Sequence, residues 1–151
     1  MTTWYLDDYV SGVRAEKLYN GTDTTWKDHL FAPGSGSGAG SGRMVGQRTT
    51  VNGGAASWNY FVQDHLGSLA VISDNTGAVI SGGRLSYDAW GKRRNTDGSD
   101  GTPTVPVTTR GFTGHEALDA IGLVNMNARL YDPAIGRFMT PDPIVQAPLF
   151  W

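Results

Sequence analysis

Short stretches in which hydrophobic and polar residues alternate occupy most of the 151-residue chain. Three regions each have one such stretch before a turn signal and one after it, namely residues 4–31, 43–62 and 69–80. The turn signals are Asn20-Gly21, Asn52-Gly53-Gly54 and Asp74-Asn75-Thr76-Gly77. Because alternation with a period of two is typical of strands, and Asn and Gly suit tight turns, each region is predicted to contain paired antiparallel strands.

The second half of the chain continues this pattern less regularly. Further strands are predicted over residues 84–90, 107–112 and 123–131, whereas Pro103 and Pro106 place residues 95–106 in a loop. Residues 114–120 form the one stretch that suggests a helix, of two turns at most. Strands that recur about every 8–12 residues predict an all-β fold, an antiparallel β-hairpin strip with at most one short helix near 114–120.

Composition narrows the classes of function. With a net charge of −2, the chain gives no reason to expect a nucleic-acid partner, and the basic run Lys92-Arg93-Arg94 is interpreted as a solvated turn. No apolar stretch suggests membrane insertion, and we expect no signal peptide, which leaves the localisation open. The absence of Cys excludes disulfides, thiolate metal sites and Cys nucleophiles.

Residues 34–42 are a Gly/Ser run with the sequence GSGSGAGSG. Such a run contributes no side chain to a core and is typical of linkers. We expect it to be engineered, either in place of a longer loop or to join two pieces. A genomic coding sequence that contains the run unbroken would contradict this expectation.

Several motifs follow one another after the run. They are Asp64-His65-Leu66-Gly67-Ser68, Thr76-Gly77-Ala78-Val79, Tyr87-Asp88-Ala89-Trp90-Gly91, Gly111-Phe112-Thr113-Gly114 and the stretch from Arg129 to Pro143. In content and order they resemble the Rhs repeat-associated core of Rhs/YD-repeat proteins. The resemblance covers residues 43–145. Residues 1–33 resemble preceding YD-type repeats, 34–42 form a linker and 146–151 a tail.

The resemblance implies a strip of hairpins that spirals into a hollow shell around a C-terminal toxin. In many members the core also cleaves itself with aspartates. Asp142 matches one family aspartate, but its downstream partner has no counterpart here. Because an aspartyl mechanism needs two carboxylates, we expect no catalytic residues and no enzyme activity. The expected partners are a protein passenger or toxin of the parent protein, or further copies of the chain joined through strand edges.

The motif residues also suggest a purely structural role. In the second long motif, Asp132 and Pro133 are predicted to open a turn that Gly136 permits, with Arg137 paired to Asp132 and both Tyr131 and Phe138 packed in the core. Asp64, His65 and Gly67 are predicted to form a buried turn. The alternative is an acid–base pair of Asp64 and His65 beside Ser68, which is disfavoured because adjacent strand residues point to opposite faces.

The remaining candidates are histidines and aromatic residues. His29, His65 and His115 lack the spacing of metal ligands, so neither a metal nor a cofactor is predicted. The aromatic set is predicted to form cross-strand ladders. It comprises Trp4, Tyr5, Tyr9, Tyr19, Trp26, Trp58, Tyr60 and Trp90. The alternative is a glycan- or protein-binding face on which Trp58 and Trp90 stack against the ligand, and solvent exposure distinguishes the two.

Overall fold

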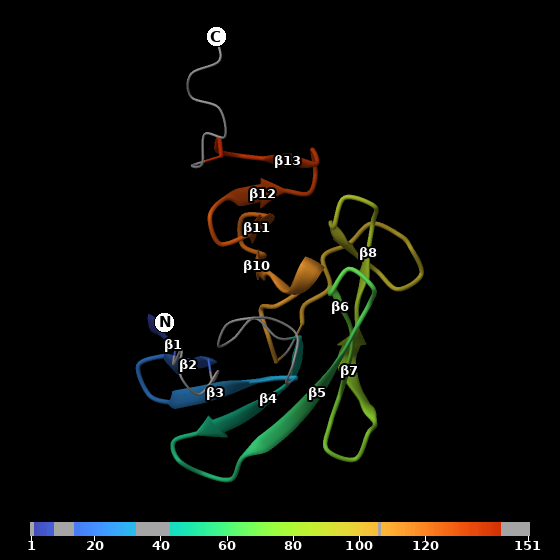
Figure 1. Cartoon of the computed structure of the whole chain (residues 1–151). Helices are drawn as coiled ribbons and strands as arrows, with labels where there is room; N and C mark the ends of the chain where they lie inside the picture. Colours follow the sequence, from blue (N-terminus) through green and yellow to red (C-terminus); the bar gives the residue numbers. More distant parts are fainter. Residues whose placement is uncertain (1, 8–13, 33–42, 106, 143–151) are drawn as a thin grey trace. The chain divides into compact units, whose positions relative to one another are not determined.

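The computed structural model describes residues 2–7, 14–32, 43–105 and 107–142. Their regular structure is almost entirely antiparallel β-sheet (Figure 1), which confirms the predicted all-β class. The chain divides into two units, Met1–Gln63 with Ala70–Arg84, and Asp64–Leu69 with Leu85–Trp151. Within the described ranges, no helix has the length and apolar character needed to cross a membrane. The four-part division expected from the sequence stays a prediction, and the run 34–42, Tyr9 and the tail 146–151 lie outside the described residues.

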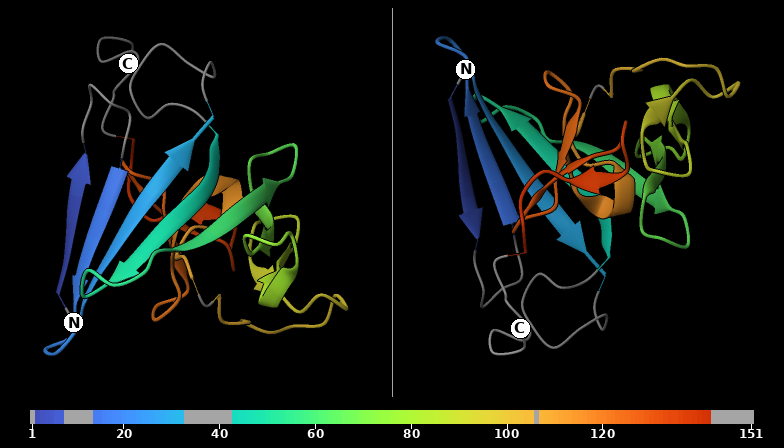
Figure 2. Two further views of the ribbon diagram at one scale, coloured as in Figure 1. Left: turned by 90° about the horizontal axis from the view of Figure 1, so that it is seen from below. Right: turned by 90° about the horizontal axis from the view of Figure 1, so that it is seen from above.

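The first unit is built on a seven-stranded sheet whose strands follow one another in chain order (Figure 2). The strands are β1 (Thr2–Asp7), β2 (Arg14–Tyr19), β3 (Thr24–Phe31), β4 (Met44–Val51), β5 (Ser57–Gln63), β6 (Leu69–Ser73) and β7 (Val79–Arg84). Such an order arises because short connections join neighbouring antiparallel strands directly. The connection between β3 and β4 contains the Gly/Ser run, and Ala32 N donates to Arg43 O at 2.8 Å where the two strands leave the ladder.

Turn chemistry explains where these strands stop. Asn20 Oδ1 accepts hydrogen bonds from the backbone N–H groups of Thr22 at 2.9 Å and Asp23 at 2.7 Å, which closes the loop between β2 and β3. Asn52 and Gly53 both have positive φ, 50° and 71°, between β4 and β5. Asn and Gly tolerate this left-handed conformation better than other residues, so the two Asn-Gly signals mark real strand ends.

One face of this sheet buries an unusual number of polar side chains. Met44, Phe61 and Ile72 supply its buried apolar residues, but Glu16, His29, Gln47 and Asn59 are buried as well. His29 lies opposite Gln47, which in turn lies opposite Asn59, so the register places these three side chains on the same face. The interior of the first unit is therefore held by hydrogen bonds as well as by apolar burial.

The second unit contains shorter strands. The pair β8 (Ser86–Tyr87) and β9 (Arg93–Arg94) is separate from a four-stranded sheet, which also follows chain order. Its strands are β10 (Glu116–Leu118), β11 (Leu123–Asn125), β12 (Leu130–Asp132) and β13 (Arg137–Phe138). Leu69, Val124 and Tyr131 are its buried hydrophobic residues.

Three strand predictions for the second half are wrong, whereas residues 114–120 keep to the predicted limit of at most one short helix. A 3₁₀ turn, η1, covers Phe112–Gly114, and β10 follows because residues 116–118 pair with β11. The strand predicted over 107–112 is reduced to a single bridge between Arg110 and Glu116. The strand predicted over 84–90 shrinks to Ser86–Tyr87, since Asp88 opens a turn. The strand predicted over 123–131 splits into β11 and β12, because Asn127 takes a positive φ of 62°. In each case tertiary pairing or a turn overrides local propensity.

Candidate functional site

Four loops of the chain share one hydrogen-bonding pattern. In each, an Asp or Asn is followed three residues later by a Gly with φ between 84° and 90°, namely Gly67, Gly77, Gly91 and Gly98. The backbone N–H of the Asp or Asn bonds the carbonyl four residues on, and the Gly N–H returns to the Asp or Asn carbonyl. These loops begin at Asp64, Asp74, Asp88 and Asn95. The pattern D/N-x-x-G-x is therefore a structural repeat of the chain, and the spacing alone could have revealed it.

The aspartate side chains reinforce these loops. Asp64 Oδ1 accepts from Leu66 N at 2.9 Å and from Ser68 N at 2.8 Å, and Asp88 Oδ1 makes the equivalent bonds to Trp90 N and Lys92 N. At Asp74, hydrogen bonds from the hydroxyl and the backbone N–H of Thr76 hold the pKa of the carboxyl below its usual value. These carboxylates thus act as turn-closing acceptors.

The turn at Asp64 is not buried as predicted. His65 is exposed and Asp64 is half-buried, whereas Ser68, after the turn, is almost fully buried. The carboxylate of Asp64 is occupied by backbone N–H groups, and Ser68 Oγ accepts from Thr113 N at 3.1 Å. Asp64 and Ser68 therefore each have backbone partners of their own.

The turn at Asp132 has the predicted backbone but differs in its side chains. Asp132 Oδ1 accepts from Ala134 N at 2.8 Å, Pro133 is buried, and Gly136 has φ 65°. Arg137 lies opposite Asp132, yet no ion pair joins these two described side chains. Phe138 is 42% exposed and so does not return to the core, because it lies on β13 at the sheet edge.

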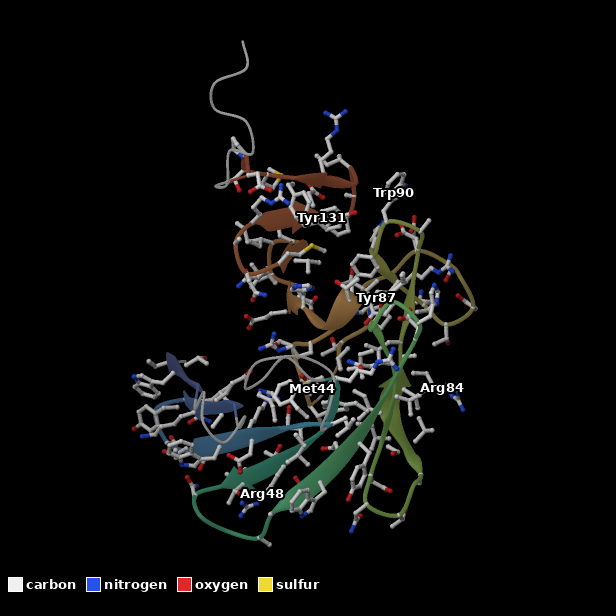
Figure 3. All side chains as sticks on the ribbon, viewed as in Figure 1. Met44, Arg48, Arg84, Tyr87, Trp90 and Tyr131 are labelled. Carbon is white, nitrogen blue, oxygen red and sulfur yellow. The ribbon has the colours of Figure 1, made fainter. Side chains whose placement is uncertain are left out.

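Aromatic rings from the family motifs form a continuous column in the second unit. Ring centroids are 6.0 Å apart for Tyr87 and Phe112, 6.4 Å for Phe112 and Tyr131, and 5.5 Å for Tyr131 and Phe138. Tyr131 Oη also donates to Trp90 O at 2.8 Å, and Figure 3 marks Tyr87, Trp90 and Tyr131. Pairs at these separations attract one another beyond simple burial. The column thus joins aromatic residues of three separate motifs, of which the stretch from Arg129 to Pro143 contributes two.

Two glycines let the backbone approach these aromatic residues closely. A Cβ on Gly91 would lie 2.4 Å from a ring carbon of Phe112, and a Cβ on Gly136 would lie 2.8 Å from a ring carbon of Trp90. Both glycines also have positive φ. Any side chain at either position would therefore be disfavoured, both by the positive φ and by the clash with the neighbouring ring.

Arg93 is the buried cation of the second unit, with only 7% of its surface exposed. Its Nη1 donates to Asp119 Oδ2 at 2.8 Å and to Pro103 O at 3.3 Å. The prediction of a solvated turn for residues 92–94 is wrong here, because pairing of β9 with β8 turns Arg93 inward. Burial raises the pKa of the neighbouring Tyr87 to about 12, against the opposing effect of Arg93, so its phenol stays protonated and donates to Leu69 O at 3.1 Å.

A cavity of about 160 Å³ lies beside this cluster. Tyr87 and Arg93 line it together with apolar groups that include Phe112, Val124 and Ala134. Sequence reasoning missed the cavity, because Arg93 and Asp119 are 26 residues apart and neither belongs to a recognisable motif.

The η1 turn holds a strained threonine. Thr113 has φ 49° and ψ 27°, a conformation that costs a β-branched residue about 1–2 kcal/mol. Its hydroxyl donates to Phe112 O at 2.8 Å and lies 2.8 Å from His115 Nδ1. Since the hydroxyl has one proton, His115 Nδ1–H donates to it. Burial and the nearby Arg110 lower the pKa of His115, which favours the neutral ring.

In the first unit, a row of residues on one face of the sheet combines aromatic rings and cations. Lys17 Nζ lies 5.2 Å from the ring centre of Trp4 and 5.3 Å from that of Trp26. In the next row, Arg48 lies 5.9 Å from the ring of Trp58 and Figure 3 labels its position. These cation–π pairs occupy the faces of the rings.

The opposite face buries an acid–base pair. His29 Nε2 lies 2.9 Å from Glu16 Oε1, and both residues are almost completely buried. Burial lowers the pKa of the half-buried Lys27, although Glu16 opposes that effect. The pair links β2 to β3 across the sheet and stabilises it only as long as both partners stay paired.

Asp142 is bound to a cation of its own motif. Arg129 Nη2 lies 3.4 Å from Asp142 Oδ2, and the Arg129 guanidinium lies 3.7 Å from the ring centre of Phe138. Among the described residues, no group of three or more His, Cys, Asp or Glu side chains is arranged to hold a metal ion. The geometry around Asp142 is that of a surface ion pair.

Comparison with known proteins gives a consistent result. The family model described as Teneurin YD-shell matches residues 52–148, well over half of the chain. Similar proteins include tRNA nuclease WapA of Bacillus subtilis (34% identity over 77 residues, 51% of this chain and 3% of that protein) and double-stranded DNA deaminase toxin A of Burkholderia cenocepacia (36% over 90 residues, 60% and 6%). Salivary gland surface protein 1 of Aedes aegypti is 37% identical over 83 residues, 55% of this chain and 2% of that protein. The chain thus spans a few per cent of the length of these relatives.

Proposed function

The chain belongs to the teneurin YD-shell family, and we propose on that basis that it is a structural piece of a shell wall and not an enzyme. The observation that carries the proposal is the unbroken succession of hairpins in the seven-stranded sheet, in which every strand pairs with its chain neighbour. A wall needs this regular extension and no reactive group. The match to the family supports the resemblance to Rhs/YD-repeat proteins on which the sequence interpretation was based.

We further propose that the parent protein encloses a polypeptide passenger of the toxin type. Two of the similar proteins are named as a nuclease and as a deaminase toxin, and each is far longer than this chain. The matched region is therefore shared by proteins that are named for different activities. A container common to different toxins would be shared in the same way.

Self-association through strand edges is the second element of this proposal. In the part of the chain that the structure describes, β1 pairs with β2 alone and β7 with β6 alone. The outer N–H and C=O groups of such edge strands favour pairing with another strand. Two copies can satisfy these groups by joining their sheets edge to edge.

Light scattering at high concentration tests the association. Lysines on the edge strands, in a double variant T3K/V79K, should lower the apparent mass toward that of the monomer, because charge on an edge opposes strand addition. V51K is the matched control, since Val51 is similarly exposed but lies on the interior strand β4. A wild-type chain that is monomeric at every concentration would refute edge pairing.

The absence of self-cleavage is tested separately. The intact mass should stay at 16.2 kDa through long incubation, and Asp142→Ala should not change it. Fragments that appear in the wild type and vanish in this variant would overturn the structural role.

A second candidate function is a glycan- or protein-binding module. It is favoured by the exposure of Trp58, at 38%, and of Trp90, at 61%, which leaves part of each ring open to a ligand. Loss of glycan-array binding in Trp58→Ala or Trp90→Ala, with the fold retained, would support it. An array without signal for the wild type would count against the glycan form.

A further inference from the structure

The loop between β2 and β3 directs two backbone donors at the side-chain carbonyl of Asn20. Thr22 N donates to Asn20 Oδ1 at 2.9 Å, and Asp23 N donates to the same oxygen at 2.7 Å. Paired N–H groups at roughly 2.7–3.1 Å stabilise an oxygen that becomes negatively charged during a reaction. Attack on Asn20 Cγ places such a charge on Oδ1. The loop therefore favours attack at this carbon.

The group placed to attack is the next backbone nitrogen, that of Gly21. The hydrogen bond from Thr22 N to Asn20 Oδ1 closes a ring of atoms that contains both Asn20 Cγ and Gly21 N, so it keeps the two reacting atoms together. No described backbone carbonyl accepts from Gly21 N–H, and the loop is exposed at residues 20–22, which leaves this group to water. Nothing lies within 4 Å of the position that a Gly21 Cβ would occupy, so the approach is open.

A second Asn-Gly pair, Asn52 and Gly53, is also exposed but is held differently. Asn52 Oδ1 accepts from one described backbone N–H, that of Thr24 at 2.8 Å, and Asn52 Nδ2 donates to Asp23 Oδ1 at 2.7 Å. Both ends of this amide are thus tied to a different loop. Loss of Nδ2 would break the bond to Asp23, whereas none of the described side-chain contacts involves Asn20 Nδ2.

We propose that Asn20 is a self-modification site, at which the side-chain amide converts to a carboxylate without an enzyme and faster than at Asn52. Hydroxide removes the proton from Gly21 N, which forms a bond to Asn20 Cγ. The Cγ–Nδ2 bond breaks, and the leaving group takes a proton from water and departs as ammonia. The product of this step is a cyclic succinimide.

One water molecule then opens the succinimide and completes the reaction. Opening at Cγ gives aspartate, and opening at the main-chain carbonyl gives isoaspartate, which carries an extra methylene carbon in the backbone. Nothing is oxidised or reduced, and either product adds one negative charge at residue 20. The proposal goes beyond the role of a shell wall and does not require it, because it depends only on the loop between β2 and β3.

Peptide mapping by mass spectrometry tests the proposal on the full chain, incubated at neutral pH either folded or in urea. In the folded chain, Asn20 should react roughly three- to tenfold faster than Asn52, the effect of one additional hydrogen bond. In urea the two Asn-Gly pairs should react at similar rates, because the loop contacts are lost. Equal rates in the folded chain, or the same advantage of Asn20 in urea, would overturn the proposal.

Two variants separate the contacts of the two asparagines. Asp23→Ala keeps the backbone N–H that donates to Asn20 but removes the carboxylate that holds Asn52 Nδ2. Asn52 should then react faster, while the rate at Asn20 stays the same. Asp97→Ala, at an exposed turn of the other unit, is the matched control and should change neither rate.

An unchanged rate at Asn52 in Asp23→Ala, with the circular dichroism spectrum of the wild type, would contradict the assigned protection of Asn52. The comparison of the folded and the urea-unfolded wild type does not depend on how this variant folds. None of these outcomes bears on the shell role, which is tested by edge association and by the absence of fragments.

Discussion

The turn between β8 and β9 offers a sharp test of how the second unit is packed. Gly91→Ala adds one methyl group at φ 90°, where the new Cβ would lie 2.4 Å from Phe112. Gly98→Ala adds the same methyl at φ 88° in a turn of the same type, but nothing lies within 4 Å of it. The two variants therefore share the conformational cost and differ only in the clash.

The expected magnitudes follow from that difference. A left-handed alanine costs about 1–2 kcal/mol, which should be the whole effect of Gly98→Ala. Forcing an extra carbon into a packed site costs about 1–3 kcal/mol more. Gly91→Ala should therefore lower the free energy of unfolding by about 2–5 kcal/mol, and the gap between the variants measures the contact with Phe112.

Urea denaturation followed by far-UV circular dichroism provides the comparison, with both variants and the wild type at one pH and temperature. Equal slopes against urea concentration would show that the unfolding transition itself has not changed. If Gly91→Ala fell within about 0.5 kcal/mol of Gly98→Ala, the aromatic column would not be packed against this turn as described.

Three further predictions concern titratable groups. Thr76→Ala should raise the lowered pKa of Asp74 toward its usual value, as measured by NMR titration. In the wild type, the hydrogen bonds to the ionised carboxylate stabilise the fold at pH values above the usual pKa. This stabilisation is lost as the pH falls through the lowered pKa. Spectrophotometric titration should find a phenol that ionises near pH 12, and this transition should be missing in Tyr87→Phe. The buried neutral phenol of Tyr87 stabilises the fold fully below the usual tyrosine pKa of about 10. That contribution is lost as the pH rises through 12. Burial and, to a smaller extent, Arg110 lower the pKa of His115, so Arg110→Gln should raise that pKa part of the way. The variant should lose less stability than the wild type as the pH falls below about 6.5, and an unchanged His115 titration would contradict the contribution of Arg110.

Strands of the first unit could be predicted from the sequence because local signals decide them. Alternation fixes the strand, and the two Asn-Gly pairs fix its end, so β2 to β5 lie close to where the pattern placed them. Neither signal depends on distant residues. The same is true of the loops at Asp64 and Asp74, in which donor and acceptor lie within four residues.

The second unit could not be predicted in the same way, because its decisive contacts are distant in sequence. Residues 114–120 have helical character, but the ladder with β11 determines their conformation. In the sequence, Arg93 belongs to a basic run that suggests a solvated turn. In the fold, Asp119 and Tyr87 lie beside Arg93, and neither contact can be inferred from the neighbouring residues. Phe138 looks like a core residue, yet its position on the outermost strand leaves it exposed.

The row of Trp4, Lys17 and Trp26 has a consequence for assembly of the sheet. The three residues are direct partners across β1, β2 and β3, so both rings reach the same ammonium group only in this alignment. A slip of one residue would send Lys17 to the opposite side of the sheet from a ring and forfeit about 0.5–1 kcal/mol for each pair. In a protein made of many similar hairpins, such a row distinguishes the correct neighbour from a mismatched one. The row therefore favours the correct register and the correct strand partner while the sheet assembles.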